Sequence, residues 1–233
     1  MKKSIILVAF AMVTGSLSAQ TLIFEEKGWA ADTTLKRGEN TYTHPYFTVY
    51  GMGDYFINQN FSIGGSIGFD FGLRHIREFG NRYAMGGAFS VDIASHRVAD
   101  TDLGMFKTQD NLVKENLELT HLHLEYFNRF TFGKSGDRIG NFLDLGIRGY
   151  RTVGADVFAE YDPGRYTSTA EIRAKNVNFV YRWHYGLTAR LGFNKFVVTG
   201  AMRLSESLKS NAPYLTGAEL PKYSLGFQIG LHK

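Results

Sequence analysis

The sequence predicts an all-β fold, a closed, antiparallel, up-and-down β-barrel of eight strands. Two observations support this fold class. Apolar and polar residues alternate along eight segments of the chain, and in most of these segments one row is bulky while the other is thinned by Gly, Ser and Ala. A period of two places successive side chains on opposite faces of a strand, which a helix cannot do.

The longest alternating segment, Asn176–Phe193, indicates the kind of barrel. Its apolar row holds no charge and much aromatic bulk: Val177, Phe179, Tyr181, Trp183, Tyr185, Leu187, Ala189, Leu191 and Phe193. Strands of ordinary globular proteins usually stop after about five or six residues. At roughly 3.3 Å per residue and a tilt near 45°, this segment rises beyond the ~25 Å apolar band of a bacterial outer-membrane barrel. The predicted barrel is therefore a transmembrane one.

Four strands are expected in the first half of the chain. Tyr46–Ile57 alternates weakly. Phe61–Arg77 and Arg82–His96 alternate strongly and place Phe, Ile, Leu or Val opposite Gly, Ser, Ala and Asp. Asn116–Phe132 is the fourth strand, and a change of phase near His121 predicts a β-bulge there.

Four more strands follow in the second half. Asn141–Tyr161 alternates Leu, Ile and Val with polar or charged residues, and Asn176–Phe193 is the sixth strand. Asn194-Lys195 predicts a two-residue hairpin turn after it. The last two strands are Phe196–Leu204 and Tyr223–Leu231.

The connections between the predicted strands are long and short in turn. The three long ones are expected to be extracellular loops: Arg97–Glu115, Asp162–Thr169 and Ser205–Lys222. Short periplasmic turns and longer outer loops are the arrangement of outer-membrane barrels. With an even number of strands, both ends of the barrel are expected on the periplasmic side.

The first 19 residues are predicted to be a secretory signal peptide. Lys2 and Lys3 precede an apolar run from Ile5 to Val13, and small residues lead to Ala19, which is the pattern of such peptides. Residues 20–45 have no clean period, so their structure is left open, and they bring the total to ten strands if they contribute to the sheet. Residues 46–233 form the predicted barrel domain.

Composition excludes several other classes of protein. The chain has no Cys, which excludes disulfides and a lipid-anchored N-terminal Cys. After the signal peptide no apolar run of about 18 residues occurs, so no membrane-spanning helix is expected. The net charge of +4 is spread along the chain, which disfavours nucleic acid as a partner.

Side-chain volume predicts which face of the barrel is outside. The interior of an eight-stranded barrel is just wide enough for side chains to fill it. Only the thinned polar rows fit there, so the bulky apolar rows are expected to face lipid. Because buried charges need partners, Arg–acid pairs are expected to fill and close the interior, drawn from Asp70, Arg74, Asp92, Asp144, Arg148, Asp156, Arg182, Arg190 and Arg203.

Aromatic residues near strand ends are expected to mark the two membrane surfaces. Tyr and Trp are enriched where lipid meets water. The residues expected in these girdles are Tyr83, Tyr126, Tyr161, Trp183 and Tyr223.

Residues 46–233 resemble the small bacterial outer-membrane β-barrel family, of which OmpA/OmpX-type domains are members. The resemblance rests on the strand rhythm, the signal peptide and the final strand YSLGFQIGLHK, which is similar to the C-terminal assembly signal of this family, although it finishes on Lys233 and not on an aromatic residue. It implies an outer-membrane location. It also implies outer-membrane lipids, lipopolysaccharide and the barrel-assembly machinery as partners.

A metal site is the first candidate site in the sequence. His121, His123 and Glu125 lie on one side of a strand and are residue types that bind metals. Three such residues are also expected in a polar barrel interior without any ion. We therefore predict no metal site.

A hydrolase site is the second candidate. Ser90, Asp92 and His96 share a face of the third strand. At about 3.3 Å per residue, His96 lies ~13 Å from Asp92, too far for a triad within one strand. Gly133-Lys134-Ser135 is similar to the end of a phosphate-binding loop, but Asn128 stands where that motif needs Gly, so a hairpin turn is expected there.

The sequence therefore predicts a non-enzymatic, integral outer-membrane protein with no catalytic residue, cofactor or metal. Its expected role is structural or interactive, carried by the extracellular loops, with an extracellular or periplasmic protein as partner. Two alternatives stay open. Some small barrels of the resembled family are outer-leaflet lipid deacylases or acyltransferases, which need a Ser, His and acid cluster at the outer rim. The other is an accessory of a secretion system, for which Thr21–Thr43 is the expected contact.

Overall fold

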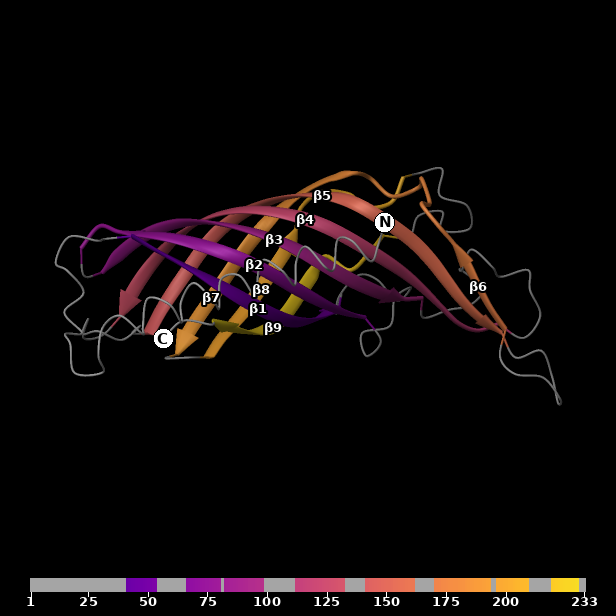
Figure 1. Cartoon of the computed structure of the whole chain (residues 1–233), viewed down its shortest axis with the longest axis horizontal. Helices are drawn as coiled ribbons and strands as arrows, with labels where there is room; N and C mark the ends of the chain where they lie inside the picture. Colours follow the sequence, from indigo (N-terminus) through magenta and orange to yellow (C-terminus); the bar gives the residue numbers. More distant parts are fainter. Residues whose placement is uncertain are drawn as a thin grey trace, which may run out of the picture. The chain divides into compact units, whose positions relative to one another are not determined.

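The computed structural model describes residues 41–53, 66–80, 82–98, 112–132, 141–161, 170–193, 196–209 and 219–230. It places nine β-strands in these ranges (Figure 1): β1 Thr41–Gly53, β2 Ile67–Glu78, β3 Tyr83–Arg97, β4 Leu112–Phe132, β5 Asn141–Tyr161, β6 Ala170–Ala174, β7 Trp183–Phe193, β8 Phe196–Arg203 and β9 Tyr223–Gly230. Within the same ranges, no helix has the length and apolarity needed to cross a membrane.

Eight of the nine strands close into a ring. Neighbouring strands pair in the order β4-β3-β2-β1-β9-β8-β7-β5-β6, and a further pairing of β4 with β5 closes the circle. All of these pairings are antiparallel. β6 pairs with β5 from Val157 to Tyr161 and is not a member of the ring. The all-β class, the antiparallel pairing and the eight-membered ring agree with the prediction from alternation.

The end of the ring with the short connections is called the turn end. β2 and β3 are joined there near Gly80, whose φ of 102° lies in the left-handed region that favours glycine. The N–H of Phe79 donates to the carbonyl of Tyr83 at 2.9 Å and closes this hairpin. Phe193 of β7 pairs with Phe196 of β8, as the predicted two-residue hairpin requires.

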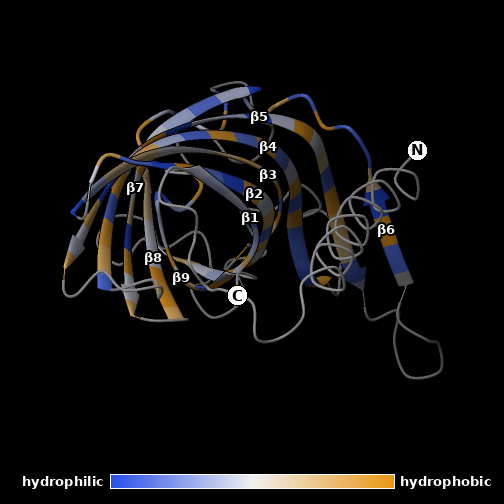
Figure 2. Cartoon of the chain, turned by 60° about the vertical axis from the view of Figure 1, so that its left-hand side comes forward, coloured by the Kyte–Doolittle hydropathy of each residue, from blue (hydrophilic) through white to orange (hydrophobic). Residues whose placement is uncertain are grey.

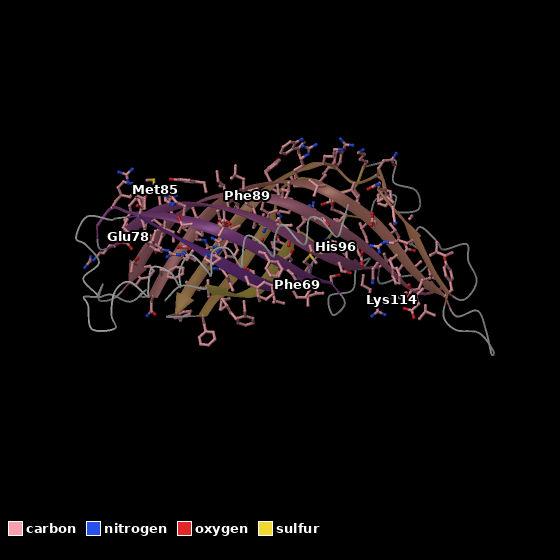
Figure 3. All side chains as sticks on the ribbon, viewed as in Figure 1. Phe69, Glu78, Met85, Phe89, His96 and Lys114 are labelled. Carbon is pink, nitrogen blue, oxygen red and sulfur yellow. The ribbon has the colours of Figure 1, made fainter. Side chains whose placement is uncertain are left out.

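The opposite end, called the loop end, carries the long connections. β4 and β5 are the longest strands, with 21 residues each, and their paired ends extend beyond the ring at this end, where β6 joins them. In Figure 3, Glu78 and Met85 lie towards the turn end and Lys114 of β4 lies towards the loop end.

The strands are staggered around the ring, and the stagger fixes their tilt. Following paired residues once around from β4 returns to β4 ten residues nearer the loop end, along the path Asn128, Leu145, Ala189, Gly200, Leu225, Gly51, Ile67, Ser95 and Glu118. Ten residues correspond to about 33 Å along a strand, and eight strand spacings to about 38 Å across the sheet. Their ratio gives a tilt of about 40° from the ring axis, inside the usual range for closed sheets.

Side chains alternate between the outside and the inside of the ring. In β7 the alternation is complete: the exposed residues are Trp183, Tyr185, Leu187, Ala189, Leu191 and Phe193, and those between them are buried. Figure 2 shows this as alternating hydrophobic and hydrophilic bands along the strands. Phe69 and Phe89, labelled in Figure 3, are 38% and 52% exposed in the outward rows of β2 and β3. The bulky rows therefore face outwards, as side-chain volume predicted.

A β-bulge interrupts the pairing of β4 with β5 where the sequence predicted one. Thr120 pairs with Gly154 and His121 pairs with Thr152, which leaves Val153 without a partner. The extra residue belongs to β5, whereas the sequence pattern had placed the phase change in β4. It reverses the facing of β5, so Ala155 and Val157 are buried beyond the bulge while Val153 is 48% exposed.

The prediction of a strand from Asn176 to Phe193 is wrong for its first part, because β7 begins at Trp183. Asn176 has a left-handed φ of 54°, and its N–H donates to Asp156 Oδ1 at 3.1 Å. The chain therefore turns at this residue. Beyond it, the N–H of Val177 donates to the carbonyl of Ala155 at 2.9 Å.

The other strand predictions differ from the structure mainly at their ends. β5 has the predicted bounds, β3, β8 and β9 agree within one residue, and β4 begins four residues before Asn116. β1 begins at Thr41, earlier than predicted, and β6 was not predicted. The predictions for residues 1–40, for the phosphate-loop resemblance at 133–135 and for most of the three long loops fall outside the described residues.

Candidate functional site

The interior of the ring is the candidate site, because buried polar side chains gather there. They form successive levels from the turn end to the loop end, and each level draws on several strands. The buried ionisable or amide side chains that point inwards include Arg74, Asp92, His121, His123, Glu125, Arg129, Asp144, His184, Arg190 and Gln228.

The level nearest the turn end contains a two-pronged ion pair between β4 and β5. Arg129 Nε and Nη2 donate to the two carboxylate oxygens of Asp144 at 2.7 and 2.9 Å. Arg129 Nη1 donates to the hydroxyl of Tyr42 at 3.1 Å. The guanidinium also lies 3.7 Å from the centre of the Phe142 ring. This geometry satisfies the buried charge from several sides and joins β1 to β4 and β5.

The next level joins β4 to β7. Arg190 is ion-paired with Glu125, and Thr188 Oγ1 donates to Glu125 Oε1 at 2.9 Å. A second carboxylate, Asp144, lies 4.0 Å from Arg190. On the other side of the ring, Arg74 Nη2 donates to Gln228 Oε1 at 3.0 Å, so β2 and β9 are linked although they are not neighbours.

The third level contains two inward aspartates on paired positions, of which Asp92 is buried and Asp70 is half-buried. Asp70 of β2 and Asp92 of β3 are register partners. The hydroxyl of Tyr50 donates to Asp92 Oδ1 at 2.5 Å, and that of Tyr46 donates to Asp70 at 3.4 Å. His123 Nε2 lies 3.7 Å from Asp92 Oδ2.

The fourth level is a group of histidines and one tyrosine. Thr152 Oγ1 lies 3.1 Å from both His121 Nδ1 and His184 Nε2 and so bridges the two rings. Tyr150 stacks on His184 with ring centres 4.8 Å apart. A cavity of about 50 Å³ remains beside these side chains, which leaves room for a few water molecules. It is too small for a channel or a substrate.

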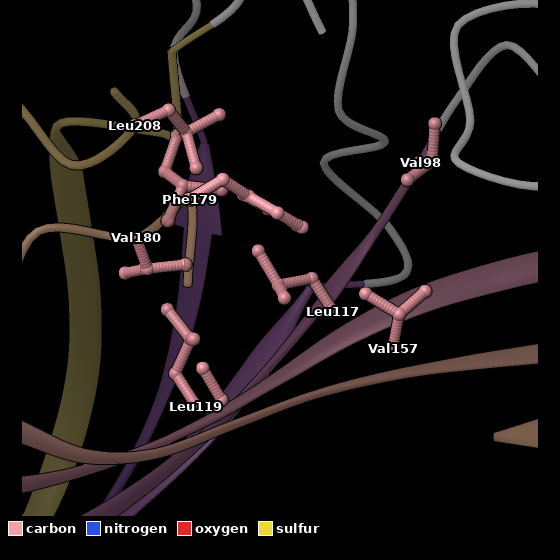
Figure 4. Close-up of a cluster of buried hydrophobic side chains, with 9 residues drawn as sticks. Val98, Leu117, Leu119, Val157, Phe179, Val180 and Leu208 are labelled. Carbon is pink, nitrogen blue, oxygen red and sulfur yellow. The ribbon is translucent and has the colours of Figure 1, made fainter. Parts of the chain in front are cut away.

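An apolar cap covers the interior at the loop end (Figure 4). It is formed by buried residues from β4, β5 and the segments between strands: Val98, Leu117, Leu119, Ala155, Val157, Phe179, Val180, Leu208 and Leu220. Arg203 anchors the segments at its edge, because it donates to the carbonyls of Ser205 and Leu220 and pairs with Glu219 at 3.1 Å. The alternation of residues 176–182 thus reflects packing in this cap.

Inward glycines show how full the interior is. A Cβ on Gly146 would lie 2.8 Å from the carbonyl oxygen of Tyr126 and 2.6 Å from Thr188 Oγ1. On the outward face, a Cβ on Gly149 or Gly200 would meet nothing closer than 3.9 Å. Close packing inside and open space outside agree with the prediction that the thinned polar rows fill the interior and the bulky apolar rows face outwards.

Seven of the nine charged residues predicted to fill the interior lie on inward rows: Asp70, Arg74, Asp92, Asp144, Arg148, Arg190 and Arg203. The prediction is wrong for Arg182, which is exposed, because the segment before β7 leaves the sheet. Asp156 is buried, but the bulge places it opposite the inward residues Ala155 and Val157. It pairs with Arg173 at 3.3 Å instead.

The three candidate metal ligands lie on one inward row, but they do not converge on a common point. His121 and His123 are neighbours with ring centres 5.9 Å apart, whereas Glu125 is engaged by Arg190 and Thr188. Among the described residues, no group of three or more His, Asp or Glu side chains has the geometry to hold a metal ion.

The candidate hydrolase residues Ser90, Asp92 and His96 are all buried on the inward row of β3. Asp92 accepts a hydrogen bond from Tyr50 of β1 and lies near His123 of β4, so these two contacts come from other strands. The three residues therefore share a face, as predicted, without forming a Ser–His–Asp chain among the contacts that the structure gives.

Four of the five aromatic residues expected in the girdles lie on outward rows. Tyr126, Trp183 and Tyr223 are exposed and Tyr83 is half-buried. Tyr161 is the exception, with 6% of its surface exposed, because the bulge turns its row of β5 inwards.

One polar contact that sequence reasoning missed is the pair Ser205 and His184. Ser205 Oγ lies 3.4 Å from His184 Nδ1, and His184 Nε2 lies 2.8 Å from the carbonyl oxygen of Tyr181. Ser205 Oγ also accepts the N–H of Tyr185 at 3.3 Å. Ser205 stands in a predicted loop, so no periodicity placed it beside His184.

Comparison with known proteins identifies no family for this chain. No protein-family model matches it, and no curated protein is significantly similar to it.

Proposed function

We propose that the chain is an integral outer-membrane β-barrel protein of the small OmpA/OmpX type, with a closed interior and an interaction role at its loop end. The observation that carries this proposal is the apolar outer face of the ring. Large hydrophobic side chains on the outward rows are exposed to a degree that a protein surrounded by water rarely tolerates; they include Leu124 at 68%, Ile147 at 60%, Trp183 at 70%, Tyr185 at 60% and Phe227 at 69%.

The height of this apolar surface supports a membrane location. On β4 the outward apolar residues run from Leu122 to Phe132. Ten residue steps correspond to about 33 Å along the strand and, at a tilt of about 40°, to about 25 Å along the ring axis. The apolar band of outer-membrane barrels has about the same height. Within this stretch the outward row of β4 holds one polar residue, Asn128, and beyond Leu122 towards the loop end it continues with Thr120 and Glu118.

The filled interior supports a structural or interactive role over that of a pore. Ion pairs cross the interior at successive levels, and the apolar cap covers them at the loop end. An ion or solute would have to displace buried pairs such as Arg129–Asp144, and breaking such a pair costs about 3–5 kcal/mol.

The loop end supplies the surface for interaction. Long loops face outwards in outer-membrane barrels, and short turns face the periplasm. The paired ends of β4 and β5 rise beyond the apolar band at that end. β6 pairs with β5 there, and its Arg173 forms an ion pair with Glu118 of β4 at 2.6 Å. This small sheet and the loops beside it form the proposed contact surface for an extracellular partner.

The first test is the electrophoretic mobility of the protein from washed outer membranes, with and without boiling. A closed barrel resists detergent until it is heated, so the unboiled protein is expected to migrate faster and to stay with the membrane after carbonate washing. A protein that washes off and shows no shift would refute the membrane location.

A second candidate, an outer-leaflet lipid hydrolase, is favoured by one observation. Ser205 lies near His184, whose other ring nitrogen is held by the carbonyl of Tyr181, and a serine beside an oriented imidazole is the start of a nucleophilic site. A fluorophosphonate probe tests it. Labelling that is lost in Ser205→Ala and in His184→Gln supports the hydrolase, and an unlabelled folded protein excludes this serine nucleophile.

A further inference from the structure

The small cavity at the fourth level of the interior is lined by more positive than negative charge. Its volume is about 50 Å³, and four histidines and the hydroxyls of two tyrosines are among its polar lining groups. Among the described lining residues, Arg148, Arg203 and Lys222 are cations and Asp92 is the one acid. The balance of these charges decides what the cavity can hold.

Two of the four charges already have partners. Arg203 pairs with Glu219 at 3.1 Å and donates to two backbone carbonyls. Asp92 Oδ1 accepts from the hydroxyl of Tyr50 at 2.5 Å, and its Oδ2 lies 3.7 Å from His123 Nε2. Arg203 and Asp92 therefore need no counter-charge from a molecule in the cavity.

Arg148 has no such partner among the described residues. No described carboxylate forms an ion pair with its guanidinium, and its buried Nε has no hydrogen-bond partner there. Its register partner on β4 is Glu125, but Arg190 and Thr188 hold that carboxylate. The guanidinium lies 5.4 Å from the centre of the Tyr150 ring, which carries no full negative charge. A half-buried cation thus faces the cavity without a counter-charge.

An anion in the cavity would remove this imbalance. A charge inside a protein is unfavourable unless an opposite charge or good solvation compensates it. The cavity has room for only a few water molecules, so water solvates Arg148 less well there than in bulk solution. A chloride ion is only slightly larger than a water molecule and therefore fits the same space.

Other donors and a route to solvent lie beside Arg148. The rings of His123 and Tyr150 both line the cavity, with centres 4.7 Å apart. Imidazole N–H and phenol O–H groups can donate to an ion. Lys222 lines the cavity and is also exposed, so the cavity approaches the surface beside a positive charge, which attracts anions.

We propose that this cavity binds one monovalent inorganic anion of the size of chloride, held by Arg148. The ion neutralises Arg148 and stabilises the interior beneath the apolar cap. The volume of the cavity excludes phosphate-bearing lipids and larger organic anions such as gluconate. Because the site lies inside the ring, this inference is independent of the membrane location proposed above.

The first test is equilibrium urea unfolding of the full-length protein in lipid vesicles, in sodium chloride and in sodium gluconate of equal ionic strength. An ion that binds only the folded state shifts the folding equilibrium by a factor of one plus its concentration divided by its dissociation constant. With about 150 mM chloride and a dissociation constant of about 15 mM, chloride should favour the folded state about tenfold over gluconate. Arg148→Gln should abolish this difference.

Arg151→Gln is the matched control. Arg151 is on the same strand but exposed on its outward row, with its guanidinium 5.5 Å from the centre of the Trp183 ring. This variant removes an equal charge away from the cavity, so the tenfold effect of chloride should remain. In gluconate, Arg148→Gln should be at least as stable as the wild type, because the unpaired charge is gone. If Arg148 were only a packing residue, its replacement would cost stability equally in both salts.

The second test needs no variant. Crystals of the wild-type protein grown in bromide should show an anomalous-scattering peak within about 3.5 Å of the Arg148 guanidinium. Three results would overturn the site: an equal effect of chloride on the wild type and Arg148→Gln, an equal loss of that effect in Arg151→Gln, or bromide at surface positions only. None of these results bears on the membrane location, which the boiling-dependent gel shift tests separately.

Discussion

The ion pair of Glu125 with Arg190 offers the sharpest test of how the ring is held together. Glu125→Gln keeps the shape of the side chain and removes its charge. The ionic bond to Arg190 is lost in this variant. The amide oxygen still accepts the hydrogen bond that Thr188 donates to Glu125 at 2.9 Å in the wild type. Arg190 stays buried, with 5% side-chain exposure, and its remaining carboxylate, Asp144, is 4.0 Å away.

The expected loss of folding free energy follows from the burial of Arg190. Breaking a buried ion pair by removing one partner costs about 3–5 kcal/mol, because the other charge stays buried without compensation. Asp144 compensates Arg190 in part, so we expect a loss of about 3 kcal/mol, about a hundredfold in the folding equilibrium. Glu118→Gln is the matched control: its partner Arg173 is at 2.6 Å, but the two side chains are 43% and 40% exposed. An exposed pair of this kind contributes about 0–1 kcal/mol.

The assay is equilibrium urea unfolding of the protein reconstituted in lipid vesicles. The double variant Glu125→Gln with Arg190→Met should recover about 1 kcal/mol or more relative to Glu125→Gln alone, since the buried unpaired charge is gone. If Glu125→Gln costs no more than Glu118→Gln, or if the two single effects simply add in the double variant, the interior pairs do not stabilise the ring as argued.

Three further changes test the packing and the facing of the strands, all by the same unfolding measurement. Leu145→Arg, which pairs with Asn128 near the middle of the apolar band and is 47% exposed, should cost about 2–4 kcal/mol in a bilayer, and a neutral effect would contradict the membrane location. Gly146→Ala should cost about 1–3 kcal/mol because its Cβ would lie 2.8 Å from a carbonyl oxygen, whereas Gly149→Ala should be within about 0.5 kcal/mol of wild type. Leu119→Ala in the apolar cap, where Leu119 is 2% exposed, should cost about 2–5 kcal/mol, and a smaller loss would mean that the cap collapses around the cavity.

The sequence predicted well which side chains point outwards and which point inwards, because each strand carries this signal at several positions. Alternation repeats at every second residue, and volume separates the two rows, since Gly, Ser and Ala leave space that Phe and Leu would overfill. β5 has its predicted bounds because charged or turn residues flank a long alternating run. β3 is predicted nearly as well for the same reason.

The pairing of interior side chains could not be read from the sequence. Arg74 meets Gln228 and Glu125 meets Arg190 across the ring, and such contacts depend on the stagger between distant strands. Alternation says that Glu125 points inwards, but not which arginine it will meet. Ser205 and His184 come together for the same reason, through the folding of a loop over the end of β7.

Alternation also misled where an apolar row packs against something other than the outside of the ring. Val177, Phe179 and Tyr181 continue the rhythm of β7, yet Val177 and Phe179 pack in or against the apolar cap. One apolar face with one polar face fits both a strand in the wall and an extended segment laid over the interior. Only Asn176, a residue type that tolerates left-handed φ, carried a local signal that the chain turns there.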